Sequence, residues 1–518
     1  MVYKTRLTSY ARRISYNVER GMFSGSLKRP TIPARCICTS RSSRSDATKA
    51  APAAEDVNAA LNSPSVAQET EDVTLMDKLL TTVRRSSNPA FHSIMPLRKP
   101  GLWAETLLSD ASSSSSTPEP SQKSPESPPT PRNMTDSYSE LILPFGSSPD
   151  LLEQYTNAAG GIRTGKLMEH LDSLAGSIAY KHMLGPDVET LGKIHERGFY
   201  IVTASVDRLD MLSALDPSRN LRLSGQVIYT GRSSMEVVVK MESIPVDGAG
   251  EETVLIGRFS MVCRDAYTHS ARDVNPLITS TAAEKQLFAL GDRKPSITVE
   301  IKHRRQSQAL RSLSRVPPSS EEAQVLHEFW LKFGKEETWK KSVAVDGKER
   351  VWMGETMVEK TMLMFPQERN VHSKVFGGYL MRLAYELGFT NASLFTRGHV
   401  RFLSLDKIAF ARPVPIGSIL KLTSCVLHST STPQFPVLVH IGVKADVIDP
   451  KTGQEQTTND FRFTWCRDHG PPLEKVVVPR TYRGSMLWLE GRRALQIGNA
   501  IRDLRTHATN PANSSKDS

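Results

Sequence analysis

The stretch Asn370-Val-His-Ser-Lys-Val-Phe-Gly-Gly-Tyr-Leu-Met381 is the most informative part of this sequence. An asparagine precedes a pair of glycines, and an apolar helix is expected to begin at that pair. Glycine lets a ligand approach the backbone closely. The first turn of a helix offers N–H groups without intrahelical partners and a partial positive charge. The pattern fits a site for a developing oxyanion, and it fits equally well a tight helix start with no chemical role.

Four segments of the chain occur twice in the same order. The pairs are Gly165-Lys-Leu-Met168 with Gly378-Tyr-Leu-Met381, Ser205–Met211 with Ser404–Phe410, Leu221–Val227 with Leu420–Val426, and Cys263-Arg-Asp265 with Cys466-Arg-Asp468. Repetition at this scale indicates that one folding unit has been duplicated.

Each repeat contains one apolar helix followed by several strands. We expect helices at Lys166–Ala179 and Tyr379–Leu387. The alternation of apolar residues from Met235 to Met241, and again from Val437 to Val447, is typical of strands with one buried face. A helix followed by a meander of strands predicts an α+β fold, in which an antiparallel sheet wraps around one long helix, twice in tandem.

The segments around the repeats differ from them in composition. The boundaries that we expect are a basic leader at 1–50, a disordered low-complexity linker at 51–135, a first repeat at 136–270, a connector with helices at 271–350, a second repeat at 351–485 and a C-terminal tail at 486–518. The serine run at Ser112–Ser116, with the prolines that follow it, cannot bury a core. Two local helices are conceivable: Leu75, Leu79, Leu80 and Val83 could form one amphipathic face, and Ser319 and Glu322 predict a capping box.

The formal net charge of +11 lies mostly in the leader, where residues 1–50 hold eleven basic and two acidic residues. An amphipathic, Arg- and Ser-rich, acid-poor N-terminus is typical of a mitochondrial transit peptide, with a plain basic tail as the alternative. We therefore expect the mitochondrial matrix as the location and no nucleic-acid partner. The sequence has no long apolar run that would span a bilayer. Its five cysteines lack the spacing of a zinc site or a disulfide framework, so no metal is expected.

The stretch at Asn370–Met381 resembles the Asn-x-x-x-x-x-Phe-Gly-Gly-x-Leu-Met signature of hotdog acyl-CoA thioesterases. The segment Ile162–Gly176 is similar to the paired helix of a first hotdog. Pro366–Asn370 and Val476–Arg493 are similar to the mitochondrial double-hotdog group. The resemblance covers about residues 135–493. It implies a double-hotdog fold, hydrolysis of fatty acyl-CoA to fatty acid and CoA, and assembly as a trimer of double hotdogs. No cofactor is expected.

In that family an asparagine of one hotdog pairs with an acid of the other, and Asn370 and Asp172 keep the required spacing. The resemblance therefore implies one composite site between the repeats. Asp172 would act as general base or nucleophile, Asn370 would orient water or polarise the thioester, and the N–H groups near Gly377 and Gly378 would hold the oxyanion. The alternative for Asp172 is a carboxylate that only stabilises the interface between the repeats.

The reciprocal site departs from the family pattern. Asn157 keeps the spacing, but Tyr385 stands where the acid is expected, with Glu386 beside it, which suggests a weakened or silent site. Because CoA carries phosphates, Lys374, Arg401 and Arg412 are candidates for binding them, although a solvated surface charge is the favoured interpretation of each.

There are two alternative functions. A catalytically silent acyl-CoA-binding or scaffold protein would keep the fold without its chemistry. A hotdog hydratase would need a His–acid pair at the helix start, which the sequence lacks. Ser485 does not lie in a Gly-x-Ser-x-Gly motif, so a serine-esterase mechanism is not supported. The sequence determines neither the acyl chain length, nor the cleavage point of the leader, nor regulation by nucleotides.

Overall fold

The computed structural model describes residues 64–89, 92, 94, 129–189, 191, 197–246, 250–292, 317–334, 347–370, 374–406, 408–410 and 412–509. The expected transit peptide at 1–50 and the serine run at 112–116 lie outside this part of the chain.

In the first repeat a long helix, α5 (Thr164–Leu184), packs against an antiparallel sheet. The main strands are β2 (Ser139–Leu143), β3 (Phe199–Val206), β5 (Asn220–Thr230), β6 (Ser234–Ile244) and β7 (Glu252–Asp265). Met235, Val237, Val239 and Met241 of β6 are buried in the same core as the apolar face of α5. The prediction that only one face of this strand is buried is wrong, because Glu236, Val238, Lys240 and Glu242 on the other face are buried as well.

The second repeat has the same design around helix α10 (Gly377–Thr396), which begins at the predicted glycine pair. Its main strands are β10 (Val358–Leu363), β11 (Arg401–Leu405), β13 (Ile419–Thr430), β14 (Val437–Ile448) and β15 (Glu455–Arg467). The helix ends at Arg397, which adopts the left-handed conformation that closes many helices.

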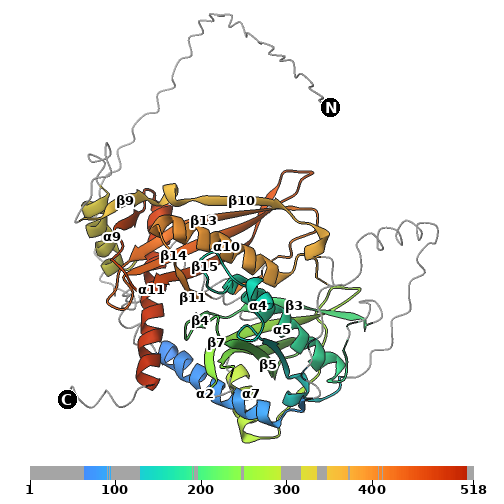
Figure 1. The fold of residues 1–518 in the computed structure, drawn as a ribbon. Coiled ribbons are helices and arrows are strands. Elements are labelled where there is room, and N and C mark those ends of the chain that lie inside the picture. Colours follow the sequence, from blue (N-terminus) through green and yellow to red (C-terminus); the bar gives the residue numbers. More distant parts are fainter. Residues whose placement is uncertain are drawn as a thin grey trace, which may run out of the picture. The chain divides into compact units, whose positions relative to one another are not determined.

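Two short strands join the repeats (Figure 1). Strand β4 (Leu209–Met211) pairs with β11 of the second repeat, and β12 (Ile408–Ala409) pairs with β3 of the first. Among the described residues twelve strands form one sheet, in the order β10-β13-β14-β15-β11-β4-β7-β6-β5-β2, with β3 and β12 off this path. Helices α5 and α10 pack against each other. The α+β fold, in which antiparallel strands wrap around one long helix in each of two repeats, is therefore confirmed, with the strands of both repeats joined in one sheet.

One of the four sequence matches is out of structural register by a residue. Cys263 pairs with Ile201 on β3, and Cys466 pairs with Arg401 on β11. In the alignment of the repeats, Arg401 corresponds to Val202 and not to Ile201. The similar Cys-Arg-Asp triplets therefore do not occupy equivalent positions, because the pairing partners on β3 and β11 decide which residues correspond.

Helix α2 (Pro64–Ser86) corrects the expectation of a disordered linker over 51–135. The suspected apolar face contributes Leu79, Leu80 and Val83, together with Met76, to a cluster with Val238 and other residues of the sheet face opposite α5. Leu75, which was expected on that face, is 39% exposed. The segment is ordered because this stripe buries apolar surface that neither the helix nor the sheet could cover alone.

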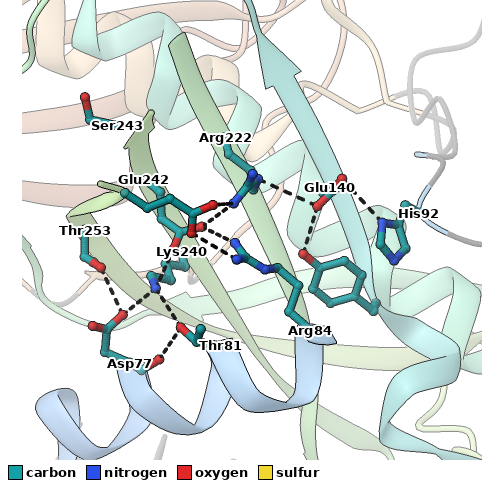
Figure 2. Close-up of polar contacts among 12 residues, drawn as sticks. Asp77, Thr81, Arg84, His92, Glu140, Arg222, Lys240, Glu242, Ser243 and Thr253 are labelled. Atoms are coloured by element: carbon teal, nitrogen blue, oxygen red, sulfur yellow. Dashed lines mark hydrogen bonds and ion pairs between the residues drawn. The ribbon is translucent and has the colours of Figure 1, made fainter. Parts of the chain in front are cut away.

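A network of charged side chains accompanies this docking (Figure 2). Glu242, which is 3% exposed, lies 2.6 Å from Lys240, 3.1 Å from Arg84 of α2 and 3.5 Å from Arg222. Lys240 also lies 2.6 Å from Asp77 of α2. The helix is thus attached to the sheet by buried ion pairs as well as by apolar contacts.

The expected C-terminal tail at 486–518 also needs correction, since α11 (Tyr482–Thr509) continues as a helix through most of it. Trp488 and Leu489 are buried in the main core, and α11 contacts β13, β14, α9 and α2. At Gly491 an added Cβ would lie 2.8 Å from the Cβ of His428 on β13. The helix forms because its apolar residues cover the outer face of the second sheet.

The connector contains α7 (Ala282–Asp292) and α9 (Ser320–Phe333). The predicted capping box is present: Ser319 accepts from the Glu322 N–H, and Glu322 accepts from the Ser319 N–H. Glu322 also pairs with Arg493 of α11. The remaining elements are β1 (Arg132–Asn133) paired with β8 (Leu277–Ile278), β9 (Glu349–Trp352) paired with β16 (Lys475–Val478), α4 (Pro149–Glu153), and 3-10 turns at Met134–Ser137, Met353–Thr356 and Pro366–Glu368.

None of the helices in the described ranges combines the length and the apolar character that crossing a membrane would need. The same ranges contain no group of three or more His, Cys, Asp or Glu side chains placed to bind a metal ion.

Candidate active site between the repeats

Asp172 is a buried carboxylate on the face of α5 that meets the second repeat. The residue is 1% exposed, and its Oδ1 accepts a 2.8 Å hydrogen bond from the Thr203 hydroxyl on β3. Burial raises the pKa of Asp172 to about 6, and hydrogen bonding by the Thr203 side chain and the Gly378 backbone opposes that rise. The carboxyl group therefore titrates near neutral pH, as a general base requires.

The glycine pair at the start of α10 lies directly against this carboxylate. A Cβ placed on Gly377 would lie 3.2 Å from Asp172 Oδ2, and one on Gly378 would lie 3.0 Å from both Asp172 Cβ and the Glu169 backbone. At Gly378 the ring of Phe376 would be 2.8 Å away. A side chain at either position would require these neighbours to shift, so glycine suits the close approach of the two helices.

Asp172 Oδ2 has no well-formed hydrogen bond in the described part of the chain, although the nearby Gly378 backbone is close enough to lower the pKa. A buried carboxylate oxygen without a full partner is costly for stability. That observation speaks against a purely structural role, because an interface carboxylate would be expected to have both oxygens satisfied.

Asn370 lies in a short loop just before α10. Its N–H donates to the Lys374 carbonyl at 2.7 Å, and its side-chain Oδ1 accepts from the Lys374 N–H at 3.1 Å. The loop therefore uses the amide oxygen to hold its own shape. Residues 371–373 are outside the described ranges, and the pairing of Asn370 with Asp172 stays a prediction.

Asn157 holds the corresponding loop of the first repeat in the same way. Its N–H donates to the Gly161 carbonyl at 2.7 Å, and its Oδ1 accepts from the Gly161 N–H at 3.0 Å. The flanking bridges, Thr156 with Ile162 and Arg369 with Val375, also correspond. The duplicated asparagines therefore have the same local conformation.

The reciprocal position is filled by aromatic rings. Tyr385 is buried and hydrogen-bonded to Thr164, and burial raises its pKa well above the usual value. Its ring centroid lies 5.5 Å from that of Phe402 and 4.8 Å from that of Trp465. Phe402 is the counterpart of Thr203, so this site lacks both the acid and the hydroxyl that supports it. The neighbouring Glu386 faces outward and pairs with Arg163 at 3.1 Å.

A buried ion pair crosses between the two helices beside Asp172. Arg382 of α10 lies 2.9 Å from Glu169 of α5, and the two residues occupy equivalent positions in the two repeats. Arg382 also lies over the ring of Tyr379. This pair fixes how α5 and α10 cross, and hence where the glycine pair meets the carboxylate.

The three basic candidates for CoA phosphates have different surroundings. Lys374 is exposed at the Asn370 loop. Arg412 is also exposed and donates to Gln456 at 2.7 Å. Arg401 donates through Nε and Nη2 to Asp468, at 2.8 and 2.5 Å, so its charge is already compensated. Of the three, Lys374 and Arg412 have exposed side chains.

Thr203 was missed by sequence reasoning. It lies on β3, where nothing in the sequence pattern distinguishes it from the other residues of that strand. Comparison of the two repeats could have pointed to Thr203. Thr203 aligns with Phe402 and Asp172 aligns with Tyr385, so the polar residues of the first repeat are both replaced by aromatic residues in the second.

Two repeats in which antiparallel strands wrap around one long helix, joined in one sheet and with the two helices packed against each other, define a tandem hotdog protein. No model of a known protein family matches the sequence. Individual relatives do match. The chain is 36% identical over 367 residues to human mitochondrial acyl-coenzyme A thioesterase 9, covering 70% of this chain and 78% of that protein.

Mitochondrial acyl-coenzyme A thioesterase 10 of Mus musculus is 34% identical over 369 residues, covering 70% and 78% of the two chains. Chloroplastic acyl-coenzyme A thioesterase 2 of Humulus lupulus is 31% identical over 353 residues, covering 67% and 76%. Among solved structures, an acyl-ACP thioesterase of Bacteroides thetaiotaomicron covers 64% of this chain and 98% of its own, at 10% identity and a TM-score of 0.35. On the sequence matches, this chain belongs to the family of acyl-coenzyme A thioesterases 9 and 10.

Proposed function

We propose that this protein hydrolyses fatty acyl-CoA to a free fatty acid and CoA at the interface between its two repeats. The observation that carries the proposal is the contact between the Asp172 carboxylate of α5 and the Gly377–Gly378 start of α10. Membership of a thioesterase family supports the reaction class.

In this mechanism Asp172 acts as a general base. Its Oδ2 takes a proton from a water molecule while the water oxygen attacks the thioester carbonyl carbon. The carbonyl oxygen becomes an oxyanion, and N–H groups at Gly377 and Gly378 stabilise it. Collapse of the tetrahedral intermediate breaks the C–S bond, and the proton held by Asp172 passes to the CoA sulfur. Direct attack by the carboxylate is the alternative first step.

Two further residues would support this reaction. Thr203 holds Asp172 Oδ1, so that Oδ2 is left to face the substrate. Asn370 is proposed to orient the water or the thioester with its side-chain amide. Lys374 and Arg412 are proposed to bind CoA phosphates at the rim of the site.

The experiment is CoA release from purified protein that lacks residues 1–50, measured with acyl-CoAs of two to twenty carbons. Asp172→Asn is expected to lower kcat by about 10²- to 10⁴-fold, the range typical of a general base. Glu153→Gln, an exposed change on α4, is the matched control. Full activity in both Asp172→Asn and Asn370→Ala would refute the mechanism. Tight acyl-CoA binding without turnover at any chain length would instead favour the silent binding protein.

The location and assembly are proposed on separate grounds. The basic leader and the mitochondrial relatives support import into the mitochondrial matrix. Assembly as a trimer of double hotdogs rests on the family resemblance. Light scattering of the protein without its leader should give three times the mass of one chain, and a monomer would refute the trimer.

A further inference from the structure

Phe410 follows strand β12, which leaves the second repeat and pairs with β3 of the first. The Phe410 N–H donates to the carbonyl of Ala204 at 3.0 Å, and Ala204 is the neighbour of Thr203. The phenyl ring is half-buried and packs at the margin of the main core. Phe410 is therefore held by its backbone next to the residues that surround Asp172.

The ring and the carboxylate face the same point in space. A Cβ on Gly377 would lie 3.2 Å from Asp172 Oδ2, and 3.4 and 3.5 Å from Cε1 and Cζ of Phe410. The open side of Gly377 is thus bounded by the unsatisfied carboxylate oxygen on one side and by an aromatic ring edge on the other. A group that approaches the start of α10 beside Asp172 would contact this ring.

We propose that Phe410 is a specificity-determining residue, whose ring packs on the acyl carbons next to the thioester carbonyl and disfavours substrates branched there. The inference rests on the proposed thioesterase function. With the carbonyl oxygen at the glycine N–H groups and the attacking water at Asp172 Oδ2, the carbonyl carbon lies near Gly377. A methyl branch on the adjacent carbon would then meet the ring, whose main chain is held in place by the hydrogen bond to Ala204 of β3.

The duplication provides a matched control within the chain. Ile408 of the second repeat pairs with Val206 of the first, and in the equivalent pairing Leu209 of the first repeat pairs with Leu405 of the second. Ile408 therefore corresponds to Leu209, and Phe410, two residues later, corresponds to Met211. Met211 is 8% exposed, and the alignment of the repeats relates it to the reciprocal position, where Tyr385 stands in place of the acid. A change at Met211 disturbs an equivalent packing position without touching the proposed site.

The experiment compares kcat/KM for butanoyl-CoA with kcat/KM for 2-methylbutanoyl-CoA. Phe410→Ala should raise the branched-to-straight ratio by about tenfold or more, the lower end of what one methyl group is worth in a fitted pocket. Phe410→Trp should lower the ratio, and Met211→Ala should leave it within about twofold of wild type. Circular dichroism and thermal melting confirm that each variant is folded.

The outcomes separate this inference from the function beneath it. If the wild-type protein releases no CoA, the proposed function fails. If it is active and the ratio is unchanged in both Phe410 variants, or moves equally in Met211→Ala, the role of Phe410 is refuted. If Phe410→Ala does not fold, the fall expected for Phe410→Trp decides the question.

Discussion

Asp172 combines nearly complete burial with one well-formed hydrogen bond, from Thr203. Tyr385, at the same position of the other repeat, is buried among rings and needs only a single hydroxyl partner. The two repeats thus use one backbone position for opposite purposes. A buried carboxylate there costs stability, which the proposed function explains by catalysis, whereas a tyrosine there fills the core.

Asp172→Asn should stabilise the fold at high pH while it removes activity. The folded-state pKa of about 6 exceeds the unfolded value of 3.8, so folding favours the protonated form. The stability that the protonated Asp172 contributes is fully present below the pKa of this carboxyl in the unfolded chain. It is lost as the pH rises through the pKa in the folded protein. At about pH 8 the variant should therefore be more stable by up to about 3 kcal/mol, and by nothing below about pH 4.

Urea unfolding of wild type and variant at both pH values is the measurement. A variant that is less stable at about pH 8 would contradict the view that the buried charge is unfavourable. In wild type, kcat/KM should fall as the pH drops through about 6, because the base becomes protonated.

Thr203→Val should lower kcat and move the pH profile upward. The hydroxyl donates to Asp172 Oδ1 and so stabilises the ionised carboxylate. Without it the pKa of Asp172 should rise, and the acid limb of kcat/KM should shift to higher pH. A role in packing alone would lower the melting temperature without moving that limb. Thr203→Ser, which keeps the hydroxyl, should restore the wild-type profile.

Helix α2 shows how an element outside the repeats becomes part of the fold. Its apolar stripe and its ion pairs cover the sheet face of the first repeat that α5 leaves open. In the second repeat α11 covers part of the outer face, and α2 and α11 contact each other. Helices that precede and follow the repeats therefore cover parts of the outer face of the sheet, while α5 and α10 of the repeats cover its inner face.

Glu242→Ala should destabilise the protein by about 3–5 kcal/mol, because it leaves Lys240 and two arginines without their shared buried partner. Glu251 offers a matched control. It contacts the same Arg84 and Arg222, at 2.9 and 2.8 Å, but is 33% exposed. Glu251→Ala should cost no more than about 1 kcal/mol. Equal losses in denaturant unfolding would show that burial of Glu242 is not what gives the network its effect.

At the scale of the whole molecule, duplication has produced an asymmetric pair of sites. The pseudo-symmetry of the fold is intact: the asparagine loops correspond, and the β4–β11 and β12–β3 pairings correspond. The side chains are not symmetric, since Tyr385 and Phe402 occupy in the second repeat the positions that Asp172 and Thr203 occupy in the first. One catalytic site for each chain is what the proposed function predicts.

Tyr385→Phe should therefore leave kcat within about twofold of wild type, whereas Asp172→Asn should remove nearly all activity. Steady-state CoA release by both variants is the measurement. If Tyr385→Phe lost activity without a change in melting temperature, the tyrosine hydroxyl would have a catalytic role, and the second site could not be called silent.

The sequence alone was sufficient for the features that depend on local pattern. Patterns among residues close together in the chain indicate the helices and strands, the start of α10 at Gly377–Gly378 and the duplication. They also give the spacing between Asp172 and Gly165. The amphipathic face of α2 was also visible, although whether it would form a helix was not, because a short stripe is stable only when a partner surface buries it.

Other features depended on contacts between residues far apart in sequence, which only the tertiary structure could decide. Thr203 meets Asp172 because strand register turns its side chain toward α5, and Phe410 meets Gly377 because β12 crosses to the other repeat. The alignment of the Cys-Arg-Asp triplets failed for the same reason, since β-strand pairing, not residue similarity, sets which positions correspond. Local pattern determined the two half-sites, and the packing of one repeat on the other determined what surrounds them.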